Sequence, residues 1–118
     1  MRYLLLDYAV TSAAPQYTPE QAKLAIQAWV DYVNELRAAG VLVHNESLRP
    51  ASDATTVRVR NGKTLTSDGP FAETHEQLGG IFILDCKDLD EAIAWAEKSP
   101  GAKYGSVEIR PVWANPQA

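Results

Sequence analysis

Two segments with helical periodicity, each lying between apolar segments of strand length, constrain the fold of this chain more than any other feature. The first begins with Thr-Pro-Glu-Gln, in which Pro19 takes the first helical position and Gln21 completes a capping box with the threonine. Apolar residues then recur at helical spacing up to Gly40, a residue typical of helix ends. Asp88 predicts the N-cap of a second helix, which ends before Pro100.

The other periodic segments have the length and composition of β-strands. Asn-Gly joins two of them, and this dipeptide is the strongest short signal for a β-hairpin because both turn residues take positive φ angles. An order of strand, helix, strand, hairpin, strand, helix, strand predicts an α+β fold of the ferredoxin-like, split βαβ kind, with an antiparallel sheet and two helices on one face. Strands are expected at residues 2–9, 41–48, 55–60, 63–66, 81–86 and 105–112, and a polar loop at residues 11–16.

The two faces of the predicted sheet indicate how many copies assemble. Segments 2–9 and 81–86 are apolar on both faces, whereas both helices are expected on the same face. The other face would expose an apolar patch, which a second copy packed sheet to sheet about a two-fold axis would cover. We therefore predict a homodimer with the architecture of a dimeric α+β barrel.

Length, charge and cysteine content exclude several classes of protein. A chain of 118 residues is expected to form one domain, residues 1–118, with residues 113–118 a short tail. The net charge of −4 and the lack of a Lys/Arg cluster argue against nucleic-acid binding, and no apolar run is long enough to predict a membrane span. The lone Cys86 has no disulfide partner within the chain, which favours the cytoplasm. No phosphate-binding loop or metal-binding Cys/His spacing is present, so neither a cofactor nor a metal ion is expected.

The segment at residues 66–80 concentrates polar residues between two pairs that constrain the backbone, Gly69-Pro70 and Gly79-Gly80. Two interpretations of Asp68 in this segment stay open. In the first, Asp68 caps a turn by accepting hydrogen bonds from backbone N–H groups, and Phe71 fills the core. In the second, the turn holds the Asp68 carboxylate at the mouth of the dimer cleft, where it is a catalytic acid or base or anchors a ligand.

Four further charged residues are candidates for ligand binding: Glu46, Arg58, Glu73 and Arg110. Three of them are placed in the middle of strands, where they would line a polar cleft if the sheet meets a second subunit. Arg58 and Arg110 suit a carboxylate or phosphate group, which a guanidinium binds bidentately; the alternative is a solvent-facing surface or cross-strand ion pairs. Glu73 belongs to a polar cluster in segment 66–80, whose spacing fits no tight metal site and favours a solvated loop.

The chain from Asp68 to Gly80 reads Asp-Gly-Pro-Phe-Ala-Glu-Thr-His-Glu-Gln-Leu-Gly-Gly, and it resembles the signature of the DGPF-domain proteins, a branch of the YCII-related (YciI-like) family. The match covers nearly all of residues 1–112. The resemblance implies a ferredoxin-like, dimeric, bacterial cytoplasmic protein without a settled activity. Some family members are encoded beside extracytoplasmic-function sigma factors, which implies a regulatory connection. Further segments that resemble blocks of the family are residues 35–42, 55–62, 88–92 and 105–112.

Two departures from the family limit what the resemblance implies about chemistry. Position 75 is His where relatives more often carry Lys, so His75 is not expected to be a family-wide catalytic base. The broader YciI-like group is associated with a His/Asp pair whose His lies in the first helix. This chain has no His between residues 18 and 40, so the chemistry of that pair is not carried over.

Two functions from different classes follow. The first is a dimeric module that binds a small ligand or a protein partner, with a link to sigma-factor-dependent transcription regulation. The second is a small cofactor-free enzyme of lyase, isomerase or hydrolase type, with Asp68 as acid or base in the dimer cleft and Arg58 or Arg110 fixing an anionic substrate. Convergence of these side chains on one pocket would favour a ligand or substrate site.

Overall fold

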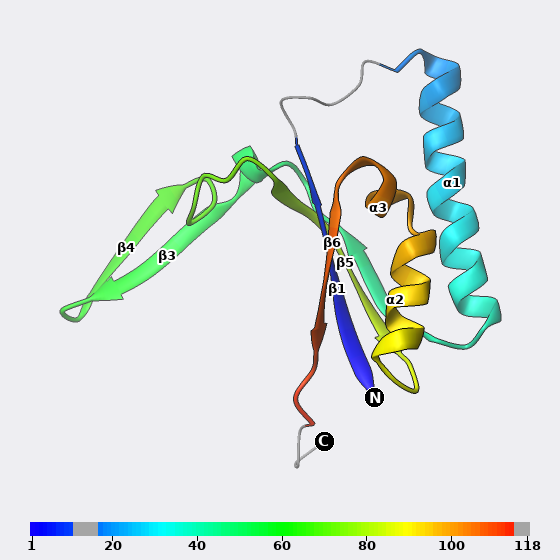
Figure 1. Ribbon diagram of the computed structural model, residues 1–118. Coiled ribbons are helices and arrows are strands. Elements are labelled where there is room, and N and C mark those ends of the chain that lie inside the picture. The colour runs from blue at the N-terminus through cyan, green and yellow to red at the C-terminus, as the bar shows by residue number, and fades with distance from the viewer. Residues whose placement is uncertain (11–16, 115–118) are drawn as a thin grey trace.

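The computed structural model describes residues 1–10 and 17–114, so the predicted loop at 11–16 and the end of the predicted tail, 115–118, lie outside the described residues. The six predicted strands and the two predicted helices follow one another along the chain in the expected order (Figure 1). The elements are β1 (Arg2–Ala9), α1 (Pro19–Ala38), β2 (Leu42–Ser47), the short 3₁₀ turn η2 (Ala51–Asp53), β3 (Thr55–Arg60), β4 (Lys63–Asp68), β5 (Gln77–Asp85), α2 (Leu89–Lys98), α3 (Pro100–Tyr104) and β6 (Ser106–Pro111).

Residues at the ends of the helices explain where they begin and end. The Thr18 hydroxyl accepts a hydrogen bond from the backbone N–H of Gln21 at 3.2 Å, and the Gln21 side chain accepts one from the Thr18 N–H at 3.0 Å. Asp88 caps α2 by accepting a hydrogen bond from the N–H of Glu91 at 2.9 Å. Gly40 follows α1 with a φ of +72°, the left-handed conformation that commonly ends helices. These predicted caps are confirmed.

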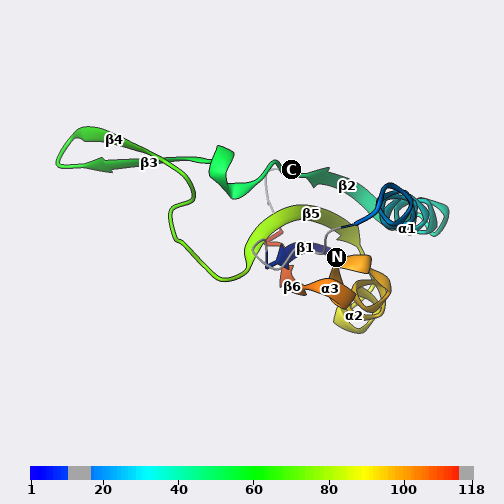
Figure 2. The ribbon, with the colours of Figure 1, turned by 90° about the horizontal axis from the view of Figure 1, so that it is seen from above.

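The main sheet is antiparallel, with the strand order β2-β5-β1-β6. The connections β1-α1-β2 and β5-α2-β6 place α1 and α2 on the same side of the sheet (Figures 1 and 2). This is the predicted ferredoxin-like, split βαβ arrangement, with the β3–β4 hairpin inserted between β2 and β5. None of the helices in the described part of the chain is long and apolar enough to cross a membrane.

The hydrophobic core lies between the main sheet and the helices. Alternate residues of the central strands point to this side, because successive side chains of a strand point to opposite faces. Cys86 is only 2% exposed, and burial raises the pKa of its thiol to about 11, so the thiol stays protonated near neutral pH. The buried members of the core are Tyr3, Leu5, Tyr32, Leu36, Val41, Phe82, Leu84, Cys86, Ala92 and Ala96.

The other face of the main sheet is covered by neither helix. Leu4 pairs with Ile83 and Leu6 with Ile81 across β1 and β5, and these residues alternate with the buried ones. They form a four-residue aliphatic patch, here called the open-face patch (Leu4, Leu6, Ile81 and Ile83). All four side chains are half-buried by their neighbours in the single chain.

The β3–β4 hairpin projects from the body as a separate two-stranded sheet (Figures 1 and 2) and is here called the arm (Thr55–Asp68). Its turn is Asn61-Gly62, with φ angles of +53° and +75°, as predicted. The radius of gyration is 16.5 Å, whereas a compact domain of this length would have about 13 Å. The single chain is therefore more extended than a compact domain, because the arm stands away from it.

Segment 66–80 differs in two respects from the expected connection. β4 extends to Asp68 and β5 begins at Gln77, so both ends of the segment are strand. β5 starts early because its first residues pair with the end of β1, Leu78 with Tyr8 and Gln77 with Ala9. The expectation that Phe71 fills the core is wrong, because Phe71 is 79% exposed and lies beside the arm, where Arg58 donates a hydrogen bond to its carbonyl oxygen.

The short helix α3 was not predicted. Pro100 stands at its first position, and the Ser99 hydroxyl accepts a hydrogen bond from the N–H of Gly101 at 3.1 Å. Five residues are too few to show a helical period, which is why no periodic signal continues beyond the end of α2.

Gly105 joins α3 to β6, and a side chain there would clash with the carbonyl oxygen of Tyr8. We expect Gly105→Ala to lower the free energy of unfolding by about 3 kcal/mol or more, because two backbone segments would have to separate. Urea unfolding measures this change. Gly79→Ala is the matched control, since its added methyl group meets nothing closer than 3.9 Å. A loss of under about 1 kcal/mol for Gly105→Ala would contradict the close approach of these two segments.

Candidate functional site

Asp68 and Arg58, two of the predicted site residues, lie on the arm. Asp68 is exposed, and its carboxylate accepts no hydrogen bond from the residues that the structure describes. The adjoining Gly69 has a φ of +92° and donates its N–H to the carbonyl oxygen of Ala54 at 2.7 Å. The turn is thus held by backbone groups, and of the two interpretations of Asp68, capping of its own turn is not observed.

Glu46 and Arg110 lie at opposite edges of the open face of the main sheet. In the strand register, Glu46 on β2 is level with the Ile81–Leu6 pair of the open-face patch, and Arg110 on β6 is level with Leu4. Each contacts a residue of its own strand: Glu46 Oε1 is 2.9 Å from Nε2 of His44, and Arg110 forms an ion pair with Glu108. The carboxylate of Glu108 raises the pKa of Arg110 through this contact. Both residues thus flank the open-face patch.

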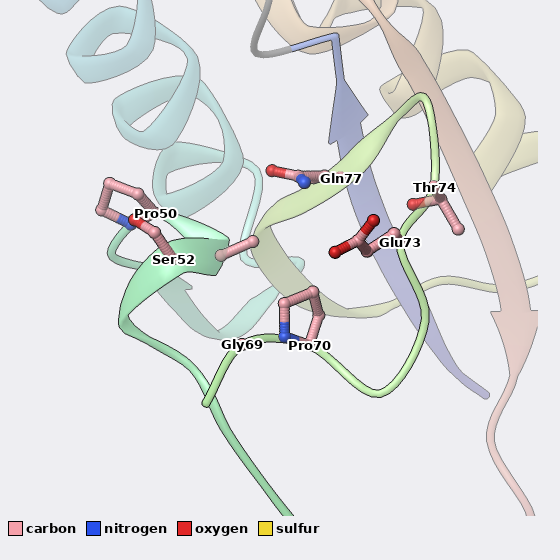
Figure 3. A pocket seen from close by; sticks show the side chains of 8 residues that line it. Pro50, Ser52, Gly69, Pro70, Glu73, Thr74 and Gln77 are labelled. Carbon is pink, nitrogen blue, oxygen red and sulfur yellow. The ribbon is translucent and has the colours of Figure 1, made fainter. Parts of the chain in front are cut away.

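Glu73 lies in the loop between β4 and β5 and lines a shallow cavity of about 540 Å³ (Figure 3). Figure 3 shows its carboxylate between Pro70 and Gln77, opposite Pro50 and Ser52 from the η2 turn. The five predicted residues therefore lie on the arm, in this loop and at the two edges of the open face, and Glu46 also lines the cavity described next. Within one chain they do not converge on one pocket, and their roles stay predictions for a dimer.

A larger cavity lies on the other side of the sheet, between the N-terminal half of α1, α3 and the adjacent ends of β1, β2 and β5. It is here called the helix-side cavity, and its volume is about 790 Å³. Most of its wall is aliphatic or aromatic, and α1 supplies Leu24, Ile26 and Val30, which are 71%, 64% and 45% exposed. Ile26 and Val30 belong to the apolar stripe of α1, so part of that stripe lines a cavity instead of the core.

Asp7 brings a carboxylate to the floor of the helix-side cavity. It follows Tyr3 and Leu5 on the helix-facing side of β1, so strand alternation sends its side chain toward the helices. Two glycines leave room for the carboxylate: a methyl group added at Gly101 would lie 3.0 Å from Asp7 Oδ1, and one at Gly80 would lie 3.8 Å from Oδ2. Among the described residues, no group donates a hydrogen bond to this carboxylate.

Burial in these apolar surroundings raises the pKa of Asp7 to about 6. The charged form loses hydration in the cavity and gains no compensating cation, so protonation is favoured. The ordinary pKa of an aspartate is 3.8, at which the side chain exchanges no protons near neutrality. At a pKa near 6, the group can accept and release a proton at physiological pH.

An aromatic wall stands above Asp7. Trp29 of α1 stacks on Phe82 of β5, with ring centroids 6.0 Å apart and an interplanar angle of 13°. Tyr32 packs edge-on against both rings, and its hydroxyl donates a hydrogen bond to the carbonyl oxygen of Trp95 at 2.9 Å. Burial raises the pKa of Tyr32, so its hydroxyl stays protonated. The aromatic wall therefore carries no charge. The carboxylate of Asp7 is a charged group that lies close to it.

The sequence contains a signal for Asp7, which the site prediction missed. Asp7 is the charged residue in the middle of an apolar strand, and its spacing from Tyr3 and Leu5 places it on the helix-facing side. The rest of the site comes from distant segments, since Gly101 and Tyr104 belong to the unpredicted α3. No group of three or more His, Cys, Asp or Glu side chains within the described ranges is placed to hold a metal ion.

Comparison with known proteins identifies the family. The chain is 35% identical over 114 residues to an uncharacterized protein of Rhizobium meliloti (strain 1021), an alignment that covers 95% of this chain and 92% of the relative. It also resembles 5-chloro-2-hydroxyhydroquinone dehydrochlorinase (TftG) from Burkholderia phenoliruptrix AC1100, solved in complex with 2,5-dihydroxybenzoquinone, with a TM-score of 0.53 over 99% of this chain and 97% of that one. Sequence identity to that enzyme is 15%, so this likeness concerns the fold alone. Since the family model of the YCII-related domain matches residues 1–115, the chain belongs to the YCII-related family.

Proposed function

We propose that this protein binds a small, largely apolar molecule in the helix-side cavity and that Asp7 anchors it through a hydrogen-bond donor of the ligand. The observation that carries the proposal is a carboxylate without a protein donor among the described residues, on the floor of a cavity of about 790 Å³ whose walls are mostly apolar. Ligand sites typically combine apolar walls with a few polar groups that fix orientation. A buried carboxylate costs stability unless something pairs with it, and a bound donor supplies that partner.

The ligand class that best fits this arrangement is a small aromatic molecule carrying a hydroxyl group. The stacked rings of Trp29 and Phe82 offer an apolar wall that suits a flat ring. A phenolic O–H would donate to Asp7, forming a hydrogen bond to a charged acceptor. The dehydrochlorinase of similar fold was solved with 2,5-dihydroxybenzoquinone, a flat quinone ring that carries hydroxyl groups, which supports including hydroquinones in a first test.

A cofactor-free enzyme is the second candidate, and the pKa of Asp7 favours it. A carboxylate with a pKa near 6 can take a proton from a bound hydroxyl or carbon acid and return it at neutral pH. The similar fold of a dehydrochlorinase adds an analogy at the level of fold. We expect proton exchange to appear as Asp7-dependent incorporation of deuterium into ring C–H positions of a bound hydroquinone in D₂O, read by NMR.

The assembly in this proposal is a homodimer in the cytoplasm, formed by the open faces of two main sheets. The open-face patch is aliphatic and has no covering element within the described chain. Glu46 and Arg110 stand at opposite edges of that patch, so a two-fold axis would bring the charged edges of two copies together. The lone, buried Cys86 suits a reducing compartment. The predicted link to sigma-factor-dependent transcription stays a prediction.

A thermal-shift and calorimetric screen of small phenols, hydroquinones, anions and metal ions tests the binding site. We expect phenols to raise the melting temperature of the wild type, and Asp7→Asn to weaken their affinity at least tenfold, because a charged hydrogen-bond acceptor is lost. Gly101→Ala should also weaken binding, since its methyl group would take space beside Asp7 Oδ1 and Trp29.

Asp68→Asn is the matched control and also tests the sequence-based prediction for Asp68. It removes an exposed carboxylate on the arm, outside the helix-side cavity, and should leave phenol binding unchanged. If Asp7→Asn binds every compound as tightly as the wild type, the proposed site is wrong. If Asp68→Asn alone abolishes binding, the ligand site lies in the dimer cleft with Asp68, which is the second of the two interpretations that the sequence left open.

A further inference from the structure

The arm lacks support from the rest of its own chain. Its sheet contains β3 and β4 alone, and Val57 and Val59 are each 60% exposed. Leu65 on the neighbouring strand is 50% exposed. A two-stranded hairpin in water is at best marginally stable, and three or more strands or a packed surface are needed for independent stability. The arm therefore requires another surface to pack on.

The direction of the arm indicates where that surface is. In Figures 1 and 2 the arm leaves the body at the β2 edge and extends to the side of the main sheet opposite α1 and α2. This is the side of the open-face patch, on which a second copy is proposed to pack. An arm that projects past this face would meet the partner in such a dimer.

The length of the arm is sufficient to reach across that partner. Each of its strands has six residues, and at about 3.4 Å per residue they span roughly 20 Å. Two sheets packed face to face are about 10 Å apart. The arm thus extends beyond the neighbouring sheet to the level of the partner's helices.

The side chains of the arm suit a surface on another copy of this chain. Val57 and Val59 share one face with Thr66 and Thr64, the residues of β4 with which they pair, so the outer part of this face carries no charge. Asp68 pairs with Thr55 at the base of the same face. The arm also carries three basic residues, Arg58, Arg60 and Lys63, against the single acidic Asp68. The whole chain has a net charge of −4, so the body that a partner presents is acidic and attracts a basic arm.

We propose that the two copies of the dimer exchange arms, each arm lying across the partner with Val57 and Val59 against it. The exchange rests on the sheet-face homodimer proposed above and adds a second, separate contact to it. It gives the exposed valines a burial site and supplies the hairpin with the packing it lacks. A second copy of the chain is thus the occupant that covers the arm.

Limited proteolysis with trypsin tests the exchange, because Arg58, Arg60 and Lys63 are cleavage sites exposed on the arm. We expect the arm of the dimer to be cut at least tenfold more slowly than the arm of the monomer, obtained by dilution or by the Ile83→Arg variant. Mass spectrometry of the fragments assigns each cut. Cleavage after Lys23, on the exposed surface of α1, provides an internal reference rate.

Substitution of the apolar face gives an independent measurement. Val57→Glu should raise the dissociation constant of the dimer at least tenfold and restore rapid cleavage of the arm, since it places a charge in an apolar contact. The side chain is exposed in the single chain, so the monomer should stay folded by circular dichroism. Ala94→Glu adds the same charge to an exposed position of α2 and should change neither quantity.

A dimer whose arm is cut as fast as that of the monomer, and whose dissociation constant is unchanged in Val57→Glu, would overturn the exchange and leave the sheet-face dimer standing. A wild-type chain that sedimentation shows to be monomeric at all concentrations would overturn both. These two results are distinct, so failure of the arm exchange is separable from failure of the dimer.

Discussion

Asp7→Asn should make the protein more stable above pH 6, although it removes a group that we place in the ligand site. Burial raises the pKa of Asp7 to about 6, which means that the folded protein holds this proton more tightly than the unfolded chain. Between about pH 4 and pH 6 the native state binds more protons, so the free energy of unfolding contributed by Asp7 falls as pH rises. Above the folded pKa the loss is complete and stays constant.

Asparagine is neutral at every pH and removes this penalty. We expect Asp7→Asn to gain roughly 1–2 kcal/mol at pH 8, an amount reduced for solvent screening of a partly exposed carboxylate. That gain corresponds to a rise of about 4–8 °C in melting temperature, and it should vanish at pH 4, where aspartate is protonated in both states. Urea unfolding at fixed protein concentration, repeated from pH 4 to pH 8, measures the difference.

Asp68→Asn is the control for this series, because it removes an exposed carboxylate on the arm, outside the helix-side cavity. A variant Asp7→Asn that is less stable than the wild type at pH 8 would show that a donor pairs with the carboxylate after all. An Asp7→Asn gain that is the same at pH 4 and pH 8 would show that burial does not raise the pKa.

A stability cost at Asp7 also bears on function. Natural sequences keep locally unfavourable residues mainly where binding or catalysis needs them, so a costly carboxylate beside an open cavity marks a candidate site. Gly80 and Gly101 fit this view, since both leave space beside the carboxylate that a side chain would enter. At position 7 we therefore expect opposite requirements: a neutral residue raises the stability of the fold, whereas the carboxylate of Asp7 is needed to bind the ligand.

The predictable parts of this fold were those set by local chemistry. Thr18, Asp88 and Asn61-Gly62 act through neighbours a few residues away, and the structure confirms the caps and the hairpin turn at these residues. The order of the elements then determined the ferredoxin-like topology. The start of β5 was missed because it depends on pairing of Gln77 and Leu78 with the end of β1, a contact between distant segments.

The candidate site was less predictable, for the same reason. A site was predicted at residues 66–80 because this segment is rich in polar residues. Polar residues in a loop are mostly exposed to solvent, as Glu73 is, so polar composition alone does not identify a site. Ile26 and Trp29 belong to one apolar stripe, yet Ile26 is 64% exposed beside a cavity and Trp29 packs on the core. The different surroundings of Ile26 and Trp29 depend on where α1 lies over the end of the sheet, and helical periodicity does not predict that position.

Ile83→Arg should convert the proposed dimer into a monomer. Ile83 lies in the middle of the open-face patch, where its neighbours across the sheet are Leu4 and the His44 end of β2. Face-to-face packing at about 10 Å would bury an arginine here against apolar side chains of the partner, with two copies of the charge near the same axis. We expect the dissociation constant to rise at least 1000-fold, on the order of 4 kcal/mol.

Sedimentation equilibrium of the wild type and the variant measures this change, and circular dichroism checks that the variant is folded. Ile93→Arg is the matched control, because Ile93 is 39% exposed on α2, in the helix layer on the other side of the sheet, and its substitution should leave the dimer intact. If Ile83→Arg stays dimeric while Ile93→Arg becomes monomeric, the copies associate through their helices. The open-face patch would then need a different partner, and the arm would extend away from the interface instead of across it.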